Sequence, residues 1–322
     1  MRIPSRPLQE LAAIRDDRVQ GAGELARRAV GALGLLARHS HAHTVREFLD
    51  ELDHLGSMLA WARPSMAVIQ RAVVSLVRAV HMKCTEEGNV LSLRDLTARL
   101  TDEHQQRHRM ASAEAAAAAA HTLSGFGCIL THSRSRTVID ALIRWSAPGR
   151  RVVITESRPM NEGFHTAREL AQANLAVTLI TDAQAGLFVP QVEAVLVGAD
   201  SVLRCGSIIN KAGTLLLALA AHRFGVPVYV ACETLKFRIS STEGEPGLEE
   251  KDPGEVAAQE GIGFTVRNIY FDITPPDLLT GIVTEAGVQS PEGAAQRIRE
   301  EENDYLPWIK RLADLRDRRV SD

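Results

Sequence analysis

The feature that most constrains the fold is an alternation of short apolar runs with helical segments after Ser124. The runs are rich in β-branched residues and cover residues 127–131, 152–155, 177–181, 194–197 and 228–232. Helical patterns lie between them, at 135–145, 163–173 and 211–224. Because most of these strands are apolar on both faces, helices should cover both sides of the sheet. The pattern predicts a parallel sheet in a doubly wound, Rossmann-like α/β domain.

The part of the chain before these runs has the apolar spacing of helices. Periodic runs cover residues 8–37, 68–82 and 92–123. Thr44 followed by Glu47 has the spacing of a capping box, which predicts a further helix that continues to residue 62. A chain of 322 residues is longer than most single domains. We therefore predict a helical N-terminal domain over 1–122 and the Rossmann-like domain over 123–322.

The composition bears on which partners the protein binds and on the cellular compartment in which it works. The net charge is −3, without a block of like charge, which disfavours nucleic acid and anionic membrane surfaces. No stretch approaches the roughly 18–20 apolar residues of a membrane span, and the N-terminus lacks a signal-peptide pattern. The cysteines are Cys84, Cys128, Cys205 and Cys232, without CxxC spacing. A disulfide framework is thus disfavoured, and we predict a cytoplasmic protein.

The first predicted strand ends in a polar segment that precedes a helix. Its residues are Thr131-His132-Ser133-Arg134-Ser135-Arg136. Open parallel sheets bind ligands at the carboxyl ends of their strands, so these side chains are candidates for ligand contacts. Hydroxyls, arginines and free helix N–H groups can form a phosphate cradle there. An ordinary helix cap is the alternative.

Later strand ends add charged residues to the same edge. Arg158 follows the second strand and can bind a phosphate in bidentate fashion, or be an ordinary surface arginine. Asp200 follows the fourth strand and can be a general acid or base, or cap a turn. Lys211, after Asn210, is expected to open a helix and meet a second anion, and Lys236 adds a cation after the fifth strand. Together they predict a pocket for a polar, anionic small molecule.

Two other motifs do not support a different chemistry. Gly21-Ala22-Gly23 with Ala26 fits a dinucleotide pattern, but no strand precedes it. His39, His41 and His43 alternate before a helix, where a solvated turn is favoured over a metal site. We predict neither a metal nor an organic cofactor.

The strand-end motifs, taken together, resemble those of one known family. They are GCILTHS at 127–133, TESRP at 155–159, GAD at 198–200, INKAGT at 209–214 and ETLKF at 233–237. Their order and spacing are similar to those of the family that joins ribose-1,5-bisphosphate isomerases to the alpha, beta and delta subunits of eukaryotic initiation factor 2B. Methylthioribose-1-phosphate isomerases belong to it as well. The similarity extends to residues 21–23, 62–65, 271–276 and 283–287, so it covers nearly the whole chain.

The resemblance implies a helical domain on a Rossmann-like domain, with a site between them for a phosphorylated ribose. It also implies assembly as homodimers or trimers of dimers. In the isomerases a cysteine takes a proton from the sugar carbon and an aspartate handles the oxygen, which converts the ring-opened aldose to a ketose. The catalytic aspartate falls on Asp200. The phosphate contacts fall on Gly21, Ala22, Gly23, Arg63, Ser135, Arg136, Asn210, Lys211 and Lys236.

Two residues depart from the isomerase pattern. Ser133 stands at the position of the catalytic cysteine, and a serine hydroxyl is a much weaker acid that needs a partner base. Gln20 stands where the isomerases usually have an arginine, which should weaken the hold on one phosphate. Cys205 is a candidate replacement thiol, or else a thiol without a role, and His132 is another candidate base.

Two functions therefore stay open at the level of sequence. The first is an aldose–ketose isomerase of the ribose-1,5-bisphosphate isomerase type with Ser133 in place of the catalytic cysteine. The second is a non-catalytic relative, either a sensor of sugar phosphates or nucleotides or an initiation-factor-2B-like regulatory subunit. Asp200 favours the first, because the initiation-factor branch often lacks that acid, whereas Ser133 and Gln20 favour the second.

Overall fold

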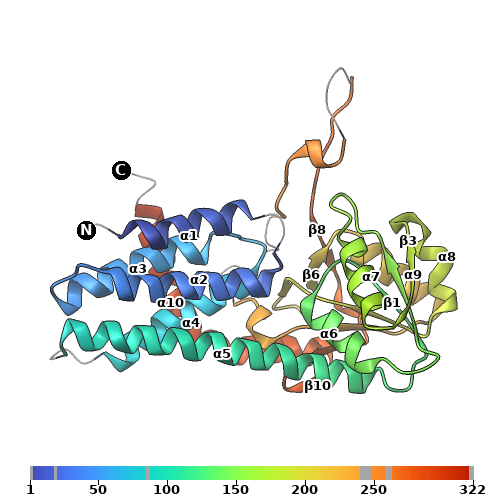
Figure 1. The fold of residues 1–322 in the computed structure, drawn as a ribbon, viewed down its shortest axis with the longest axis horizontal. Helices are drawn as coiled ribbons and strands as arrows, with labels where there is room; N and C mark the ends of the chain where they lie inside the picture. Colours follow the sequence, from blue (N-terminus) through green and yellow to red (C-terminus); the bar gives the residue numbers. More distant parts are fainter. Residues whose placement is uncertain (1–2, 18–19, 85–87, 240–247, 258–262, 319–322) are drawn as a thin grey trace. The chain divides into compact units, whose positions relative to one another are not determined.

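The computed structural model describes residues 3–17, 20–84, 88–239, 248–257 and 263–318 (Figure 1). Contacts between residues divide them into two compact units. The first unit holds the described residues of Met1–Met110, Leu235–Gly244 and Ile298–Asp322, and the second holds those of Ala111–Thr234 and Glu245–Arg297. Both units thus draw on separate stretches of the chain, whereas the sequence predicts a single boundary after residue 122.

Helices build the first unit. They are α1 (Ser5–Asp16), α2 (Ala22–His39), α3 (Val45–Ala60), α4 (Ala67–Lys83), most of α5 (Val90–Thr122) and most of α10 (Pro291–Arg318). Fully buried leucines on α2, α3 and α4 fill the core, among them Leu33, Leu55 and Leu76. The predicted capping box is confirmed, since the Thr44 hydroxyl accepts the Glu47 N–H at 3.2 Å and the Glu47 carboxylate accepts the Thr44 N–H.

The predicted helical run over residues 8–37 consists of two helices. α1 ends at Asp16 because Asp17 has extended backbone angles, and α2 begins at Ala22. The break coincides with the charged run Arg15-Asp16-Asp17-Arg18, which interrupts the apolar periodicity. The predicted helix over 92–123 corresponds closely to α5.

A seven-stranded sheet forms the centre of the second unit. Its strands are β1 (Cys128–Thr131), β2 (Arg151–Thr155), β3 (Ala176–Ile180), β4 (Ala194–Val197), β7 (Val228–Ala231), β9 (Gly281–Thr284) and β10 (Gly287–Gln289). Their order is β10-β9-β7-β4-β1-β2-β3, and every neighbouring pair is parallel except β10 with β9. Together with the helical N-terminal region, this sheet confirms the predicted α/β fold.

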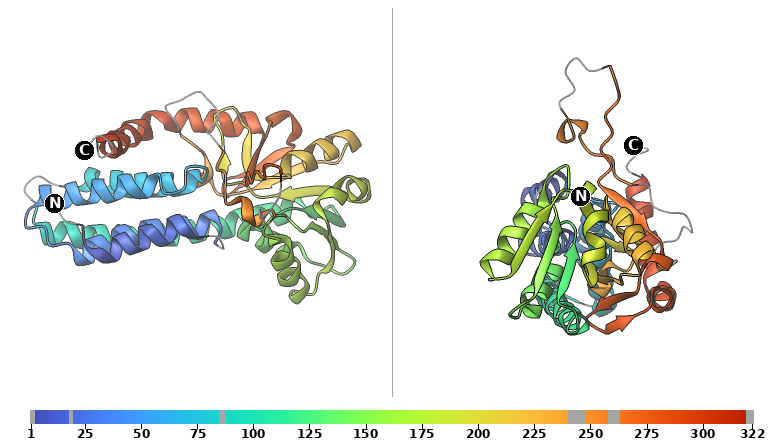
Figure 2. Two further views of the ribbon diagram at one scale, coloured as in Figure 1. Left: turned by 90° about the horizontal axis from the view of Figure 1, so that it is seen from above. Right: turned by 90° about the vertical axis from the view of Figure 1, so that its right-hand side faces the viewer.

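Helices follow the strands and cover the sheet. They are α6 (Arg136–Trp145), α7 (Glu162–Gln172), the short α8 (Ala185–Phe188) and α9 (Thr214–Phe224). The chain moves from β1 to β2 to β3 in one direction and from β4 to β7 in the other, so right-handed crossovers place α6 and α7 on one face and α9 on the opposite face (Figure 2). The end of α5 packs beside α6, where Ala116, Leu142 and Trp145 are buried against the sheet.

A second sheet of three antiparallel strands joins distant parts of the chain. It consists of β5 (Ser201–Val202), β6 (Ile208–Lys211) and β8 (Phe271–Thr274), in the order β5-β6-β8. The prediction that Lys211 opens a helix is wrong, because Lys211 ends β6 and α9 begins at Thr214. Pairing of β6 with β8, some sixty residues away, determines this, and no local pattern shows such a contact.

Short 3-10 turns complete the described elements. They lie at Asp182–Gln184, Val189–Gln191, Thr234–Lys236, Pro253–Glu255 and Pro276–Leu278. Within the part of the chain that the structure describes, no helix has the length and apolar character needed to cross a membrane.

Candidate functional site

The strand order changes direction between β1 and β4, at the centre of the large sheet. Ligands of open α/β sheets bind outside the carboxyl ends of the strands at such a switch point. Ser133 and Ser135 follow β1, and Asp200 follows β4. The two loops approach closely, because a Cβ built on Gly198 would lie 2.8 Å from the Cβ of Ser135. The topology therefore brings these predicted residues to neighbouring strand ends.

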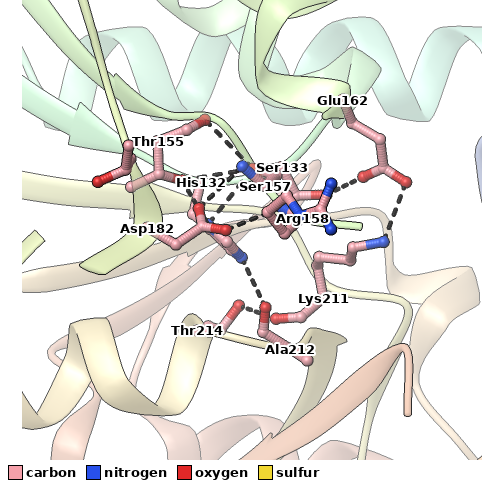
Figure 3. A network of polar contacts seen from close by, with 12 residues as sticks. His132, Ser133, Thr155, Ser157, Arg158, Glu162, Asp182, Lys211, Ala212 and Thr214 are labelled. Atoms are coloured by element: carbon pink, nitrogen blue, oxygen red, sulfur yellow. Dashed lines mark hydrogen bonds and ion pairs between the residues drawn. The ribbon is translucent and has the colours of Figure 1, made fainter. Parts of the chain in front are cut away.

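His132 connects the chain after β1 with the end of β2 and with the chain after β6 (Figure 3). Its Nε2 lies 3.1 Å from the carbonyl oxygen of Ala212, and its Nδ1 lies 2.5 Å from the Thr155 hydroxyl. Since a carbonyl can only accept, Nε2 carries the proton and Nδ1 accepts from the hydroxyl. Burial lowers the pKa of His132, so the ring is neutral. With both nitrogens engaged inside the protein, His132 has a structural role here.

Ser133 is held in a left-handed backbone conformation, with φ of 68°. Its N–H donates to the Ser157 hydroxyl at 2.8 Å, and its carbonyl accepts from the Thr166 hydroxyl at 3.2 Å. Its own hydroxyl donates to Oε2 of Glu162 at 2.7 Å. Strained conformations of this kind persist where the surroundings fix them, and they cluster at functional sites.

Glu162 connects Ser133 with Lys211 (Figure 3). It is the first residue of α7, and its Oε1 accepts from the Lys211 ammonium at 3.2 Å. The Lys211 side chain is buried, and its nitrogen lies 4.1 Å from the centre of the Tyr270 ring. A carboxylate and an aromatic face thus hold this cation at the end of β6.

The neighbouring residues Asn210 and Asp272 organise the start of α9. The Asn210 amide donates to the Thr214 hydroxyl at 3.0 Å. Oδ2 of Asp272 accepts the N–H groups of Gly213 and Leu215 at 2.7 and 3.1 Å. Burial raises the pKa of Asp272 to about 6, although these two donors act in the opposite direction.

Arg158 and its loop are anchored by Asp182. The two oxygens of this carboxylate accept the backbone N–H groups of Ser157 and Arg158, each at 2.8 Å. The exposed Arg158 guanidinium donates to the carbonyl oxygen of Val256 at 2.9 Å. A phosphate would therefore compete with a backbone carbonyl for Arg158.

The first residues of α6 were predicted to form either a phosphate cradle or an ordinary helix cap. Ser135 acts as an ordinary helix cap, with its hydroxyl accepting the Val138 N–H at 3.4 Å. The exposed Arg136 guanidinium contacts the carboxylates of Asp140 and Glu169, which raise its pKa. Any phosphate at Arg136 must displace or share these carboxylates.

Asp200 precedes the hairpin of β5 and β6, and Cys205 lies in its turn. The N–H of Asp200 donates to the Ile209 carbonyl at 2.8 Å, so Asp200 stands where the chain leaves β4 for the hairpin. Cys205 lies in the tight turn of that hairpin, where it is exposed and its thiol contacts the Ser207 hydroxyl at 3.2 Å. The structure thus places this thiol at the tip of the hairpin, five residues from Asp200 in sequence.

The remaining predicted phosphate contacts belong to the first unit. They are Gly21, Ala22, Gly23, Arg63 and Lys236. Gly21 precedes α2, and its carbonyl accepts the N–H groups of Glu24 and Leu25. Arg63 is buried and donates to the Asp17 carbonyl at 2.9 Å, and Lys236 is buried in a 3-10 turn. The Gln20 amide oxygen accepts from Arg28 at 3.0 Å.

Comparison with known proteins settles the family. Residues 18–291 match the sequence model of the Initiation factor 2 subunit family. The chain belongs to this family. Among relatives, it is 36% identical over 293 residues to a Pyrococcus abyssi protein provisionally named translation initiation factor eIF-2B subunit 2-like, covering 90% of this chain and 98% of the relative.

Other members of the Initiation factor 2 subunit family carry an enzyme's name. The ribose 1,5-bisphosphate isomerase of Pyrococcus furiosus is 31% identical over 296 residues, which are 89% of this chain and 91% of that protein. Among solved structures, the translation initiation factor eIF-2B of Pyrococcus horikoshii matches with a TM-score of 0.76 and 34% identity, covering 89% of this chain and 98% of the other. The family resemblance inferred from the strand-end motifs is confirmed.

Several residues of this family member's site were not singled out from its sequence. They are Glu162, Asp182, Tyr270 and Asp272. The predicted helix over 163–173 begins one residue after Glu162, so a carboxylate at its N-terminus was the only signal present in the sequence. Over the described ranges, no group of three or more His, Cys, Asp or Glu residues is arranged to hold a metal ion.

Proposed function

We propose that this chain binds a phosphorylated ribose and acts as an aldose–ketose isomerase of the ribose-1,5-bisphosphate isomerase type, with Ser133 in place of the catalytic cysteine. The observation that carries the proposal is the chain of contacts from Lys211 through Glu162 to Ser133 at the carboxyl edge of the sheet. A cation, a carboxylate and a hydroxyl meet beside the strand end that carries Asp200. These groups are the ones that binding an anion and moving protons require.

The phosphate contacts carried over from the family form the second part of the proposal. They are Gly21, Ala22, Gly23, Arg63, Ser135, Arg136, Asn210, Lys211 and Lys236, and Arg158 is added from its place after β2. Similarity to the Pyrococcus furiosus isomerase over most of both chains supports this assignment. In the structure, Arg136 and Lys211 pair with carboxylates, so a phosphate would share these two cations with Glu169 and Glu162.

Isomerisation of ribose 1,5-bisphosphate by the purified protein, followed by NMR, tests the function. We expect the wild type to form the ketose and Asp200→Asn to lose activity, because that aspartate is assigned to proton transfer at oxygen. Asp277→Asn is the matched control, since Asp277 is an exposed aspartate in a 3-10 turn. If Asp200→Asn is as active as the control, the assignment of Asp200 to proton transfer is wrong.

A second candidate function is a non-catalytic sensor or initiation-factor-2B-like regulatory subunit. Ser133 in place of a thiol favours it, as does the 36% identity to the initiation-factor-like relative. In that case the wild type binds the sugar phosphate without turnover, and only Ser133→Cys gains activity. The same NMR experiment therefore separates the two functions.

The proposal extends to assembly and compartment. We propose a homodimer or a trimer of dimers, as the family resemblance implies, and native mass spectrometry of the full chain measures it. Bisphosphorylated sugars carry several negative charges and do not cross a lipid bilayer unaided. Since the proposed substrate is retained inside the cell, we place the protein in the cytoplasm.

A further inference from the structure

We propose that Glu162 is the general base that takes the carbon-bound proton of the sugar, and that Ser133 positions it. The inference rests on the proposed isomerase function and names a residue for the step that the missing cysteine leaves unassigned. Ser133 stands at the cysteine position, and its hydroxyl donates to Oε2 of Glu162 at 2.7 Å. The carboxylate therefore lies one hydrogen bond beyond the place that the family gives to the thiol.

The surroundings of Glu162 suit a base. The side chain is only partly exposed, at 29%, so it is neither sealed in the core nor freely solvated. Both of its oxygens face donors, the Ser133 hydroxyl and the Lys211 ammonium at 3.2 Å. Contacts on both oxygens fix the orientation of the carboxylate, which proton transfer requires. Carboxylates serve as bases in the isomerisation of other sugar phosphates.

The location of Glu162 is fixed by the fold. It is the first residue of α7, and the next residue, Gly163, packs so tightly that a Cβ there would lie 1.9 Å from the Thr155 carbonyl oxygen. The start of α7 is thereby held against the end of β2, beside the loop of Ser133. A fixed backbone on both sides gives the carboxylate the defined position that proton transfer needs.

The other candidate bases fit less well. The serine hydroxyl donates to Glu162, so it is a weak acid hydrogen-bonded to a base and does not itself accept a proton from carbon. His132 is buried, and its two nitrogens contact Ala212 and Thr155. Cys205 lies at the exposed tip of the β5–β6 hairpin, with its thiol directed to Ser207. Glu162 is therefore the best-placed acceptor beside Ser133.

The proposed reaction conserves protons and electrons. Ring opening breaks the bond between C1 and the ring oxygen, which takes a proton from Asp200. Glu162 removes the proton of C2, and the electron pair of that C–H bond forms the C1=C2 double bond of an enol phosphate. Glu162 then returns a proton to C1 while the C2 hydroxyl gives its proton to Asp200, which leaves a ketone at C2. Both carboxyl groups end in their starting states.

The test compares variants of the full chain in D2O, with turnover of ribose 1,5-bisphosphate and loss of the C2 hydrogen measured by NMR. Glu162→Gln keeps an oxygen acceptor for Ser133 but cannot act as a base, so kcat should fall by about 10²- to 10⁴-fold while calorimetry still detects binding. Glu162→Asp keeps the carboxylate at a shorter reach and should retain part of the activity. Glu193→Gln is the matched control, because Glu193 accepts the Gly127 N–H at the opposite, amino-terminal edge of the sheet.

Ser133→Ala tests the positioning role through the separate effects on kcat and KM. Without the hydroxyl donor the Glu162 carboxylate loses one of the contacts that orient it, so kcat should fall about tenfold while KM changes little. Wild-type turnover with full activity in Glu162→Gln overturns the base assignment and leaves the isomerase function standing. Turnover that appears only in Ser133→Cys overturns both, as does a wild type that neither binds nor converts the sugar phosphate.

Discussion

The ring of His132 lies so close to the backbone of Gly213 that a Cβ on Gly213 would come within 2.9 Å of the His132 Cε1 atom. Gly213 also has φ of 113°, which side chains rarely tolerate. It is therefore the residue that lets the end of β6 turn into α9 directly over the buried imidazole, next to Lys211.

Gly213→Ala should destabilise the protein by about 3 kcal/mol, because backbone strain and contact with a buried ring act together. Gly225→Ala is the matched variant, since Gly225 also has positive φ but an added Cβ there would meet nothing within 4 Å, and about 1 kcal/mol is expected. Urea unfolding measures both. If the two variants lose the same free energy of unfolding, the contact with His132 does not contribute to the effect of Gly213→Ala.

Lys211→Ala should weaken binding of ribose 1,5-bisphosphate severalfold or more, because it removes the buried cation at the end of β6. Isothermal calorimetry measures the affinity. Lys310→Ala, which removes an exposed lysine of α10, should leave it unchanged. Binding to the Lys211 variant as tight as to the control would count against the proposed site.

Glu169→Gln should tighten the binding of ribose 1,5-bisphosphate about threefold. The Glu169 carboxylate contacts the Arg136 guanidinium, so its loss releases one competitor for this proposed phosphate ligand. The double variant with Arg136→Gln should lose the gain, since the effect acts through Arg136. If the gain persists in the double variant, Arg136 is not the residue through which Glu169 acts.

The local sequence predicted the strands and helices much more accurately than it predicted the contacts of the candidate site. Apolar runs predicted β1, β2, β3, β4 and β7 to within a residue or two, and β4 lies at the predicted residues 194–197, but no run predicted the parallel strand β9. The capping box at Thr44 needed only residues three positions apart. Such features depend on neighbours in the sequence, so their patterns are visible without a structure.

The errors and omissions lie where distant segments meet. Lys211 was expected on a helix because its pairing partner Phe271 is sixty residues away. Asp140 lies four residues after Arg136 on the same helix, but Glu169 opposite Arg136 and Glu162 opposite Lys211 come from α7, and no local spacing relates them to these cations. Strand-end positions could thus be predicted from topology, whereas the partner of each charge depends on how loops pack.

The last prediction concerns stability and pH. Burial raises the pKa of Asp272 from 3.8 to about 6, so the folded protein binds this proton more tightly than the unfolded chain. Stability from this group is fully present below pH 3.8 and is lost as pH rises to about 6. This change in the pKa of Asp272, about two pH units, corresponds to a change of at most about 3 kcal/mol in the free energy of unfolding. Asp272→Asn keeps an oxygen acceptor for the N–H groups of Gly213 and Leu215 and removes the titration.

Relative to Asp272→Asn, the wild type should therefore lose stability between about pH 4 and pH 7, as measured by urea unfolding at each pH. Added salt should change the difference little, because desolvation rather than a distant charge causes the shift. A wild type that gains stability over this range would mean that the two N–H donors outweigh burial. Asp272 would then act as a charged cap of α9, and its Oδ1, which has no hydrogen-bond partner among the described residues, would need contact with solvent.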